Sequence, residues 1–180
     1  MLRHDLGDGA HLRLAERRDA DELAALIAAN RDHLSRWMPW AAASDLDSTK
    51  AFIDLTLAQI ANDDGFQTAM VRDSRIIGMV GFHGVDWAHR STSVGYWLAE
   101  EQQGRGTMTR AVRALVEHAF TTWELHRVEI QAATGNPRSQ AIPIRLGFTR
   151  EGVLRGVEKV GDRYLDHVVF GMLAPEWRAH

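Results

Sequence analysis

Apolar residues recur at intervals of three and four between residues 107 and 123, with charged residues between them. This spacing is typical of an amphipathic α-helix, and here it gives the strongest helical pattern in the chain. Weaker helical patterns predict further helices at residues 19–30, from 48 to about 63, and at 139–146.

Local signals predict where the earlier helices begin and end. Asp19 followed by Glu22 predicts a capping box at the first helix, and Ser48 is the expected cap of a later one. A helical turn that carries Trp37 is expected to end before Pro39, because proline lacks the N–H group that would continue it.

Elsewhere the pattern changes to that of strands. Strands are predicted on both sides of a two-residue turn at Gly161 and Asp162, and at residues 11–15, 66–71, 75–82, 93–98 and 127–132. The order strand, loop, helix, strand across residues 93–132 requires a crossover, so one strand pair must be parallel. No repeat, low-complexity tract or linker interrupts the pattern, and we therefore expect residues 1–180 to form one domain of mixed sheet and helices.

Composition narrows the class of protein. The chain has 180 residues, of which 45% are hydrophobic and 25% charged, enough for a core without covalent crosslinks. Its net charge is -3 and it has no long run of Lys or Arg, which argues against direct nucleic-acid binding. The absence of cysteine excludes disulfides, thiolate zinc sites and a cysteine nucleophile.

The first ten residues are polar, and no apolar stretch approaches the roughly 20 residues that cross a bilayer. We therefore expect no signal peptide, no membrane contact and a cytoplasmic location.

A glycine-rich loop precedes the long helix. Gly104 and Gly106 let the backbone approach an anion, the helix start adds unpaired N–H groups, and Arg105 and Arg110 add positive charge. By itself, such a loop is equally compatible with a simple turn. Thr109 replaces the third glycine of a dinucleotide fingerprint, and the Gly-Lys-Ser/Thr triplet of a P-loop is absent. A phosphate-bearing ligand of another kind is expected.

Two groups of residues together resemble the GNAT acetyltransferase superfamily. The first resembles its acetyl-coenzyme A (acetyl-CoA) motif and comprises Gly95-Tyr96-Trp97-Leu98 and Gln103-Gly104-Arg105-Gly106-Thr107-Met108-Thr109. The second resembles the ribosomal-protein N-acetyltransferase branch (RimJ/RimL type) and comprises Leu34, Trp37, Pro39, Trp40, Asn136-Pro137-Arg138-Ser139, Arg145-Leu146-Gly147-Phe148 and Glu151-Gly152. The similarity covers nearly the whole chain. It departs at Glu101, where the superfamily favours Gln or Arg, and this puts a side-chain role at that position in doubt.

The resemblance implies an α+β fold of the α/β sandwich type. Its mixed, mostly antiparallel sheet would have six to seven strands, with helices on both faces. The fourth and fifth strands would be a splayed parallel pair that leaves a cleft between them.

The resemblance also implies acetyl-CoA as the cosubstrate. Trp97 and Leu98 would offer backbone groups to the pantetheine arm, and Asn136 would anchor it, although Asn before Pro is also common turn chemistry. The pyrophosphate would be held by the loop residues Gln103, Gly104, Arg105, Gly106, Thr107, Met108 and Thr109.

Acetylation of an amine needs a base that takes the amine proton and a donor that meets the departing thiolate. Without cysteine, direct attack in a ternary complex is the simplest scheme. The resemblance places the base at Glu158 and the thiolate-protonating hydroxyl at Ser139. The alternatives are that Glu158 is a solvated strand residue paired with a lysine and that Ser139 only opens a short helix.

The acceptor site is expected to include Trp37, Trp40, His83 and Tyr164, although aromatic residues are more commonly part of a core. The nine histidines show no His-Glu-x-x-His pattern, and no metal is expected.

The sequence therefore predicts an acetyl-CoA-dependent N-acetyltransferase that acts on a primary amine, with a protein N-terminal α-amine as the first-choice acceptor. Two alternatives stay open. One is acetylation of a small amine such as an antibiotic, a polyamine or a toxin-like compound, and the other is a non-catalytic acetyl-CoA sensor. Relatives of this type are often dimers, so a homodimer is also considered.

Overall fold

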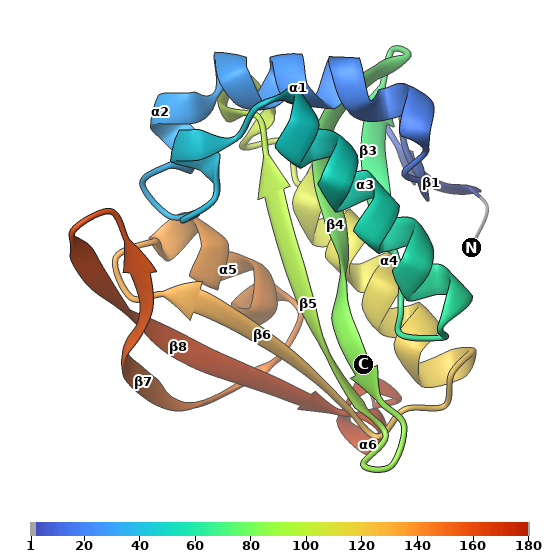
Figure 1. Ribbon diagram of the computed structural model, residues 1–180. Coiled ribbons are helices and arrows are strands. Elements are labelled where there is room, and N and C mark those ends of the chain that lie inside the picture. The colour runs from blue at the N-terminus through green and yellow to red at the C-terminus, as the bar shows by residue number, and fades with distance from the viewer. Residues whose placement is uncertain (1–2, 180) are drawn as a thin grey trace.

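One mixed sheet lies at the centre of the computed structural model, which describes residues 3–179 (Figure 1). Its eight strands have the order β1-β2-β3-β4-β5-β6-β8-β7, and each neighbouring pair is antiparallel except β5 with β6. The strands are β1 (Arg3–Gly7), β2 (Ala10–Leu14), β3 (Gln67–Arg72), β4 (Arg75–Asp86), β5 (Ser91–Leu98), β6 (Arg127–Ala133), β7 (Thr149–Val160) and β8 (Arg163–Leu173).

The sheet has more strands than the six to seven expected, because the polar N-terminus forms β1. Only Leu6 of this strand is buried, so β1 lacks the alternation of apolar and polar residues that marks a half-buried strand. With β1 counted, the parallel pair is the fifth and sixth strands rather than the fourth and fifth.

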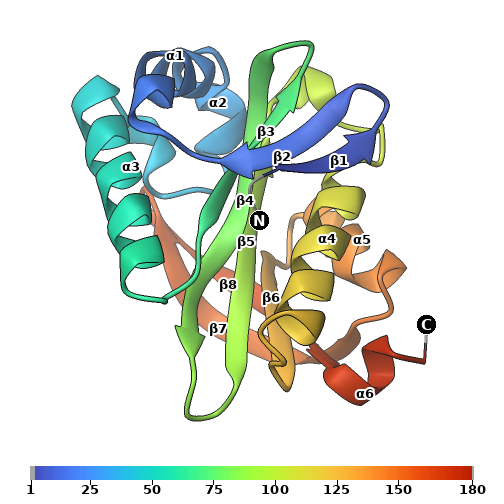
Figure 2. The same ribbon diagram turned by 90° about the vertical axis from the view of Figure 1, so that its right-hand side faces the viewer.

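Helices cover both faces of the sheet, as expected. Figure 2 shows α1 and α3 on one face and α4 and α5 on the other. The helices are α1 (Ala20–Ala29), α2 (Arg31–Leu34), α3 (Leu46–Ala61), α4 (Thr107–Thr121), α5 (Pro137–Arg145) and α6 (Ala174–Trp177). Within residues 3–179, no helix is long and apolar enough to cross a membrane.

Each face of the sheet carries an apolar core. On one face, α4 buries the side chains that its pattern predicts, among them Met108, Val112 and Leu115. On the other face, α3 buries Thr49, Ile53 and Thr56 but leaves Phe52 and Leu55 exposed. The apolar positions that marked α3 in the sequence are therefore only partly the ones that face the sheet.

The cap expected for α3 is shifted. Its N-cap is Asp45, whose carboxylate accepts a hydrogen bond from the Ser48 N–H at 2.8 Å, and the Ser48 hydroxyl accepts one from the Asp45 N–H at 2.9 Å. Ser48 is thus the third residue of the helix, which begins earlier than predicted because an aspartate was available to cap it.

The capping box expected at Asp19 and Glu22 is wrong, because both carboxylates bind elsewhere. The Asp19 carboxylate accepts hydrogen bonds from Arg13 and from the Glu16 N–H. The Glu22 carboxylate accepts the N–H of Ile76 in β4 at 2.8 Å. Asp19 instead closes a capping box that begins at Glu16, and Glu22 binds the sheet.

The parallel pair β5 and β6 is joined over three residues only, Ser91 to Ser93 against Arg127 to Glu129. Beyond that point β5 continues alongside β4 to Leu98, whereas β6 continues alongside β8. The sheet therefore opens between β5 and β6, and both clefts described below border this opening (Figure 1).

Candidate active site

The loop between β5 and α4 contains two glycines in left-handed backbone conformations. Gly104 has a φ of 77° and Gly106 a φ of 69°, values that other residues adopt only with strain. Gly106 is also the N-cap of α4, and no side chain caps this helix. The N–H groups of the first turn are thus available to an anion at the positive end of the helix dipole.

Arg72, at the end of β3, holds both sides of this loop. Its guanidinium donates to the side-chain oxygen of Gln102 at 2.7 Å and to the Thr107 hydroxyl at 2.8 Å, and the residue is 7% exposed. The Thr107 hydroxyl is therefore turned into the protein, so this residue can offer only its backbone to a ligand in the cleft.

A first cleft of about 1290 Å³ lies between the end of β5, this loop, α5 and the segment after α2. Every residue expected to bind the cosubstrate lines it, namely Trp97, Leu98, Gln103, Gly104, Arg105, Gly106, Thr107, Met108, Thr109 and Asn136. Arginines also line the first cleft, which makes it suitable for a ligand with several phosphates.

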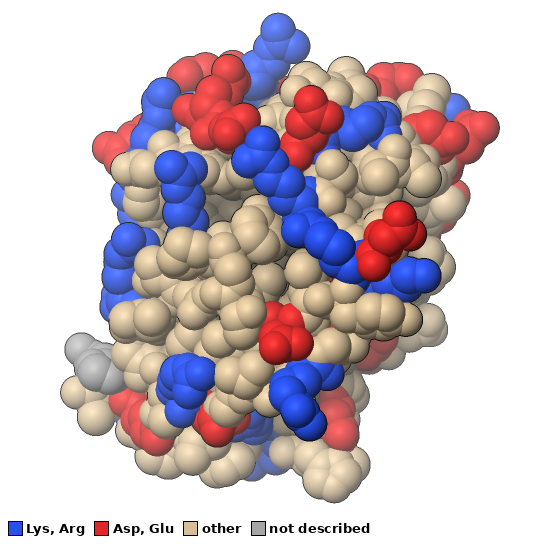
Figure 3. All heavy atoms as spheres, turned by 90° about the vertical axis from the view of Figure 1, so that its left-hand side faces the viewer, with Lys and Arg blue, Asp and Glu red and all other residues tan. Residues whose placement is uncertain are grey.

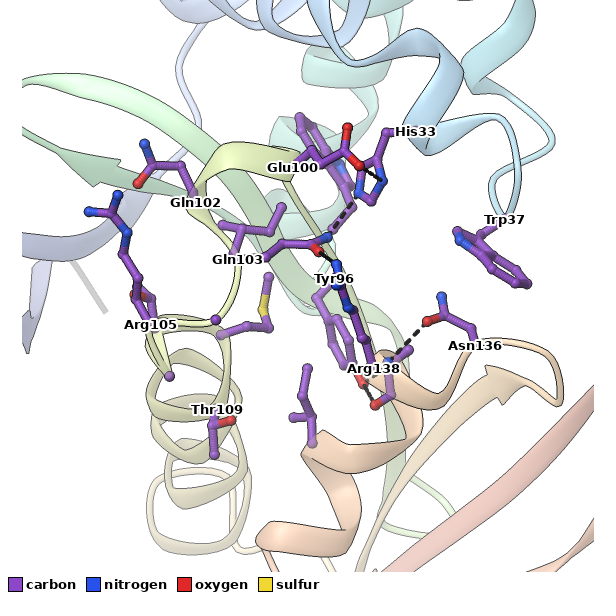
Figure 4. A pocket seen from close by; sticks show the side chains of 18 of the residues that line it. His33, Trp37, Tyr96, Glu100, Gln102, Gln103, Arg105, Thr109, Asn136 and Arg138 are labelled. Carbon is purple, nitrogen blue, oxygen red and sulfur yellow. Dashed lines mark hydrogen bonds and ion pairs between the residues drawn. The ribbon is translucent and has the colours of Figure 1, made fainter.

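The side chain of Gln103 spans the first cleft (Figure 4). Its amide oxygen accepts a hydrogen bond from Arg138 of α5 at 2.7 Å, and its amide nitrogen donates to His33 Nε2 of α2 at 2.9 Å. Gln103 thus links the two elements that face one another across the loop, and the Arg138 guanidinium is held toward the cleft.

Asn136, Ser139 and Tyr96 meet where the first cleft joins a second. The Asn136 side chain accepts the Ser139 N–H at 3.1 Å and so caps α5. The Ser139 hydroxyl donates to the Tyr96 oxygen at 3.3 Å, and the Tyr96 hydroxyl donates to the Ser139 carbonyl at 3.1 Å. Burial raises the pKa of Tyr96 to about 12, so its phenol keeps its proton at any ordinary pH.

The second cleft has a volume of about 790 Å³ and lies between α1, α3, the segment after α2 and strands β4 to β8. Trp37, Trp40 and His83, three of the four residues expected at the acceptor site, line it. Tyr164, the fourth, is 68% exposed near the β7–β8 turn and lines neither cleft. The Trp40 indole packs against Trp97 with ring centroids 6.0 Å apart, and Phe52 and Met79 extend the apolar wall.

Glu158 lies in the wall of the second cleft because β7 is irregular just before it. The register of β7 against β8 shifts between Leu154 and Glu158, and the Asp166 carboxylate holds this bulge by accepting the Gly156 N–H at 2.7 Å. His167 Nε2 of β8 lies 3.1 Å from Glu158 Oε2, without the alignment of a hydrogen bond. The two groups would form an ion pair when the imidazole is protonated.

Two residues that line these clefts, Tyr96 and His167, and one that holds the loop, Arg72, were missed as site residues in the sequence. Tyr96 lies inside the motif, but only the structure shows that its hydroxyl reaches Ser139. Arg72 is a cation that ends a strand of otherwise mostly apolar residues, which is a weak signal of a buried role. Nothing in the sequence indicates a site role for His167, because its contact with Glu158 depends on the bulge in β7. No cluster of three or more potential metal ligands occurs among the residues described.

Comparisons with known proteins place the chain among acetyltransferases. A family model described as an acetyltransferase (GNAT) domain matches residues 10–149. The chain is 36% identical over 168 residues to YdaF of Bacillus subtilis, with 92% of each chain covered. It is 28% identical to the ribosomal protein uS5-alanine N-acetyltransferase of Escherichia coli, over 92% of this chain and 88% of that one. The crystal structure of the microcin C7 self-immunity acetyltransferase MccE, in complex with acetyl-CoA and AMP, is 27% identical over 93% of this chain and 94% of that one, with a TM-score of 0.88.

Proposed function

The chain belongs to the GNAT acetyltransferase family, and we propose that it acetylates the α-amine at the N-terminus of a protein, with a ribosomal protein as the first candidate. The enzyme class is that of acetyl-CoA-dependent N-acetyltransferases. One observation supports an acceptor with a single positive charge, and the ribosomal-protein names of relatives support a protein. The second cleft has apolar walls and a single carboxylate, Glu158, among the described residues that line it, and it meets the first cleft at Ser139.

The residues of the first cleft fit acetyl-CoA. The left-handed glycines and the uncapped start of α4 supply N–H groups for a pyrophosphate. Arg105, Arg110 and Arg138 add positive charge around them, although Arg110 is already paired with Asp8 at 2.9 Å. Trp97 and Leu98 lie where β5 has left β6, and both line the first cleft along the path expected for the pantetheine arm.

The second cleft suits an amine with one positive charge. Two aspartates at the ends of α3 are already engaged in hydrogen bonds of the fold. Asp45 caps α3, and Asp64, past the other end of that helix, accepts the N–H of Val85 in β4 at 2.9 Å. Figure 3 shows a band of Lys and Arg side chains across the face that lies at the left of Figure 1. A polyamine would find few carboxylates to hold its second charge.

Acetyl transfer to an amine requires three functions from the residues of the chain. They must take a proton from the acceptor ammonium, polarise the thioester carbonyl, and protonate the departing thiolate. Glu158 stands in the cleft wall as the basic group. Ser139, at the junction, has its hydroxyl beside the buried phenol of Tyr96, and the two form a short route for a proton or a hydrogen bond to sulfur. Asn136 keeps Ser139 in place by capping α5.

Acetylation of a small compound is the second candidate, because the structure of MccE contains acetyl-CoA and AMP and that protein is named for self-immunity to microcin C7. The volume and apolar walls of the second cleft would admit such a compound as readily as the first residues of a peptide.

Release of free thiol from acetyl-CoA, measured with a panel of amines, tests the proposal. The panel contains peptides with free N-termini, the same peptides with blocked N-termini and a lysine, polyamines, and small aminoacyl compounds. We expect release with free N-termini only, and mass spectrometry should locate one added acetyl group on the α-nitrogen. Release with small amines alone would replace the proposal by the second candidate. Tight binding of the coenzyme without thiol release in the presence of any amine would favour the non-catalytic acetyl-CoA sensor.

Two further properties stay predictions. The ribosomal-protein names of the relatives support a cytoplasmic location. The homodimer can be tested by light scattering coupled to size-exclusion chromatography, in which a monomer mass near 20.2 kDa would contradict it.

A further inference from the structure

His83 lies where β4 passes the opening of the sheet. It follows the Phe82–Val94 pair of β4 and β5 and begins a short irregular stretch, after which the pairing resumes with Val85 and Thr92. A Cβ placed on Gly95 would lie 2.2 Å from His83 Nε2. The Nε2 edge of the imidazole therefore packs against the β5 backbone at Gly95, two residues past the end of the β5–β6 pairing, and only a glycine at position 95 leaves room for it.

The two ring nitrogens of His83 have different surroundings. Nδ1 is 3.2 Å from the Ser93 hydroxyl oxygen, and the ring borders the second cleft together with Tyr96, Ser139 and Glu158. A hydrogen bond donated by Nδ1 to Ser93 leaves a free lone pair on Nε2, the nitrogen over Gly95. This is the tautomer that a general base requires.

The charges around His83 are few. Burial by the cleft walls lowers the pKa of His83 below its ordinary value of 6.5, although the ring stays open to solvent through the cleft, and the negative charge of Glu158 offsets part of this decrease. His167 of β8 lies behind Glu158, Tyr96 of β5 is a neutral phenol, and Asp64 is bound to the backbone of Val85. Burial therefore favours the neutral form of the His83 imidazole, and Glu158 is the carboxylate that opposes this effect.

We propose that His83 Nε2 is the group that takes the proton from the acceptor amine, and that Glu158 acts by stabilising the imidazolium that forms. The inference rests on the proposed function, in which the resemblance had placed the base at Glu158. The acceptor enters as an ammonium ion and loses one proton to His83 Nε2. Its lone pair then attacks the thioester carbon, the C–N bond forms and the C–S bond breaks. The second proton lost from nitrogen balances the one gained by the thiolate, and His83 returns its proton to solvent.

The sign of the pH dependence follows from this assignment. His83 must be neutral to act, so turnover is retained above its pKa and lost as the pH falls through it. Because Glu158 raises that pKa, a neutral residue at position 158 should move the acid limb of the pH–rate profile to lower pH. If Glu158 were itself the base, the same change would abolish the limb instead of moving it.

The experiment compares H83Q, E158Q and H167N with the wild type, using the amine of the panel that reacts fastest. H89N is the matched control, because His89 is an exposed histidine of the same hairpin and pairs only with Asp86. We expect H83Q to lower kcat about a hundred-fold above pH 7, the scale of a lost general base, and to remove the acid limb. We expect E158Q to keep part of the activity with its limb shifted to lower pH, and H89N to behave as the wild type.

Coenzyme affinity, measured by calorimetry, separates a loss of chemistry from a loss of structure, since His83 lines only the second cleft. It should be unchanged in H83Q. As a second variant, G95A should reproduce the defect by displacing the ring while leaving His83 in the chain. An acid limb that persists in H83Q, or one that disappears in H167N, would overturn the inference. A failure of this inference can be distinguished from a failure of the proposed function, because the proposed function is decided by which amine reacts. Absence of turnover with every amine would overturn both.

Discussion

Gly104 has a left-handed backbone conformation in the glycine-rich loop before α4. Its φ of 77° lies in the left-handed region, and a Cβ there would meet no atom within 4 Å. Any effect of a methyl group at this position therefore comes from backbone strain rather than from a clash. The strain of a left-handed residue with a side chain is about 1–2 kcal/mol.

We expect Gly104→Ala to weaken coenzyme binding by about five- to thirty-fold, the affinity equivalent of that strain if the loop relaxes to avoid it. Isothermal calorimetry with acetyl-CoA measures the change. Gly152→Ala is the control, because Gly152 also has open space around its Cβ position but no left-handed φ. Equal affinity in the wild type and in the Gly104 variant would show that the loop does not need this conformation.

The hydrogen-bond partners of charged residues were the features least predictable from the sequence. Glu22 and Asp19 have the spacing of a capping box, yet both bind partners on the sheet. In contrast, Asn136 caps α5, as the Asn-Pro sequence at the start of that helix allows. A short polar side chain has several partners within reach, and the choice depends on what the fold brings near it.

At the scale of elements, the most informative contact joins β3 to the loop and to α4. The Arg72 guanidinium binds one side chain before the glycine-rich loop and one after it, so it sets the distance between the two ends of the loop. Among the described residues no carboxylate forms a salt bridge with Arg72, and its charge therefore adds to the positive potential at the start of α4.

We expect Arg72→Met to weaken acetyl-CoA binding about ten-fold, because two charge-assisted hydrogen bonds that order the loop are lost. The methionine keeps most of the buried volume. Arg75→Met is the control, since Arg75 is the register partner of Arg72 across the β3–β4 turn but is exposed. The same calorimetric titration measures both. A loss of thermal stability in the Arg72 variant without a change in affinity would mean that the contact supports the fold and not the loop.

The elements themselves were predicted well where periodicity is strong. The helix α4, the hairpin turn at Gly161 and the crossover between β5 and β6 all occur as expected. The strand β1 was missed and the start of α3 was misplaced. Both errors concern elements near the surface, where one face of apolar residues is incomplete and the burial pattern carries little information.

At the scale of the whole molecule, a buried ion pair links β2 to the start of α1. Arg13 donates to Asp19 at 2.6 and 2.7 Å, and the Asp19 side chain is 5% exposed. Burial alone would raise the pKa of Asp19, but the hydrogen bonds from Arg13 and from the Glu16 N–H outweigh it and hold the pKa below 3.8. The folded state therefore favours the ionised carboxylate.

The pair should make stability depend on pH in a defined direction. Because the pKa is lower in the folded state, the stabilisation is present above pH 3.8 and is lost as the pH falls through the folded-state value. We expect Asp19→Asn to lower the free energy of unfolding by about 3 kcal/mol at pH 7, since it leaves Arg13 without its partner. Urea denaturation at pH 7 and at several values below pH 4 measures the difference.

The difference between the Asp19 variant and the wild type should shrink below pH 4, where the wild-type carboxyl also takes up its proton. Asp54→Asn is the control, because the Arg17–Asp54 pair is exposed and such pairs contribute less than about 1 kcal/mol. A difference that does not vary with pH would assign the effect to packing rather than to the charge.

The sequence by itself determined the mixed class of the fold, most of the strands and helices from β2 onward, and the glycine-rich loop before α4. These features depend on neighbours within a few residues, namely the period of apolar positions and the left-handed freedom of two glycines. The resemblance to a family added the identity of the cosubstrate and the expected roles of Glu158 and Ser139.

Only the tertiary structure decided which groups meet in the second cleft. His83 comes from β4, Glu158 from β7 and His167 from β8, and no spacing along the chain relates them. Their meeting depends on the opening between β5 and β6, on the bulge that turns Glu158 inward and on the missing Cβ of Gly95. Contacts between distant strands follow from sheet order and register, which are set by the packing of the whole core rather than by any one segment.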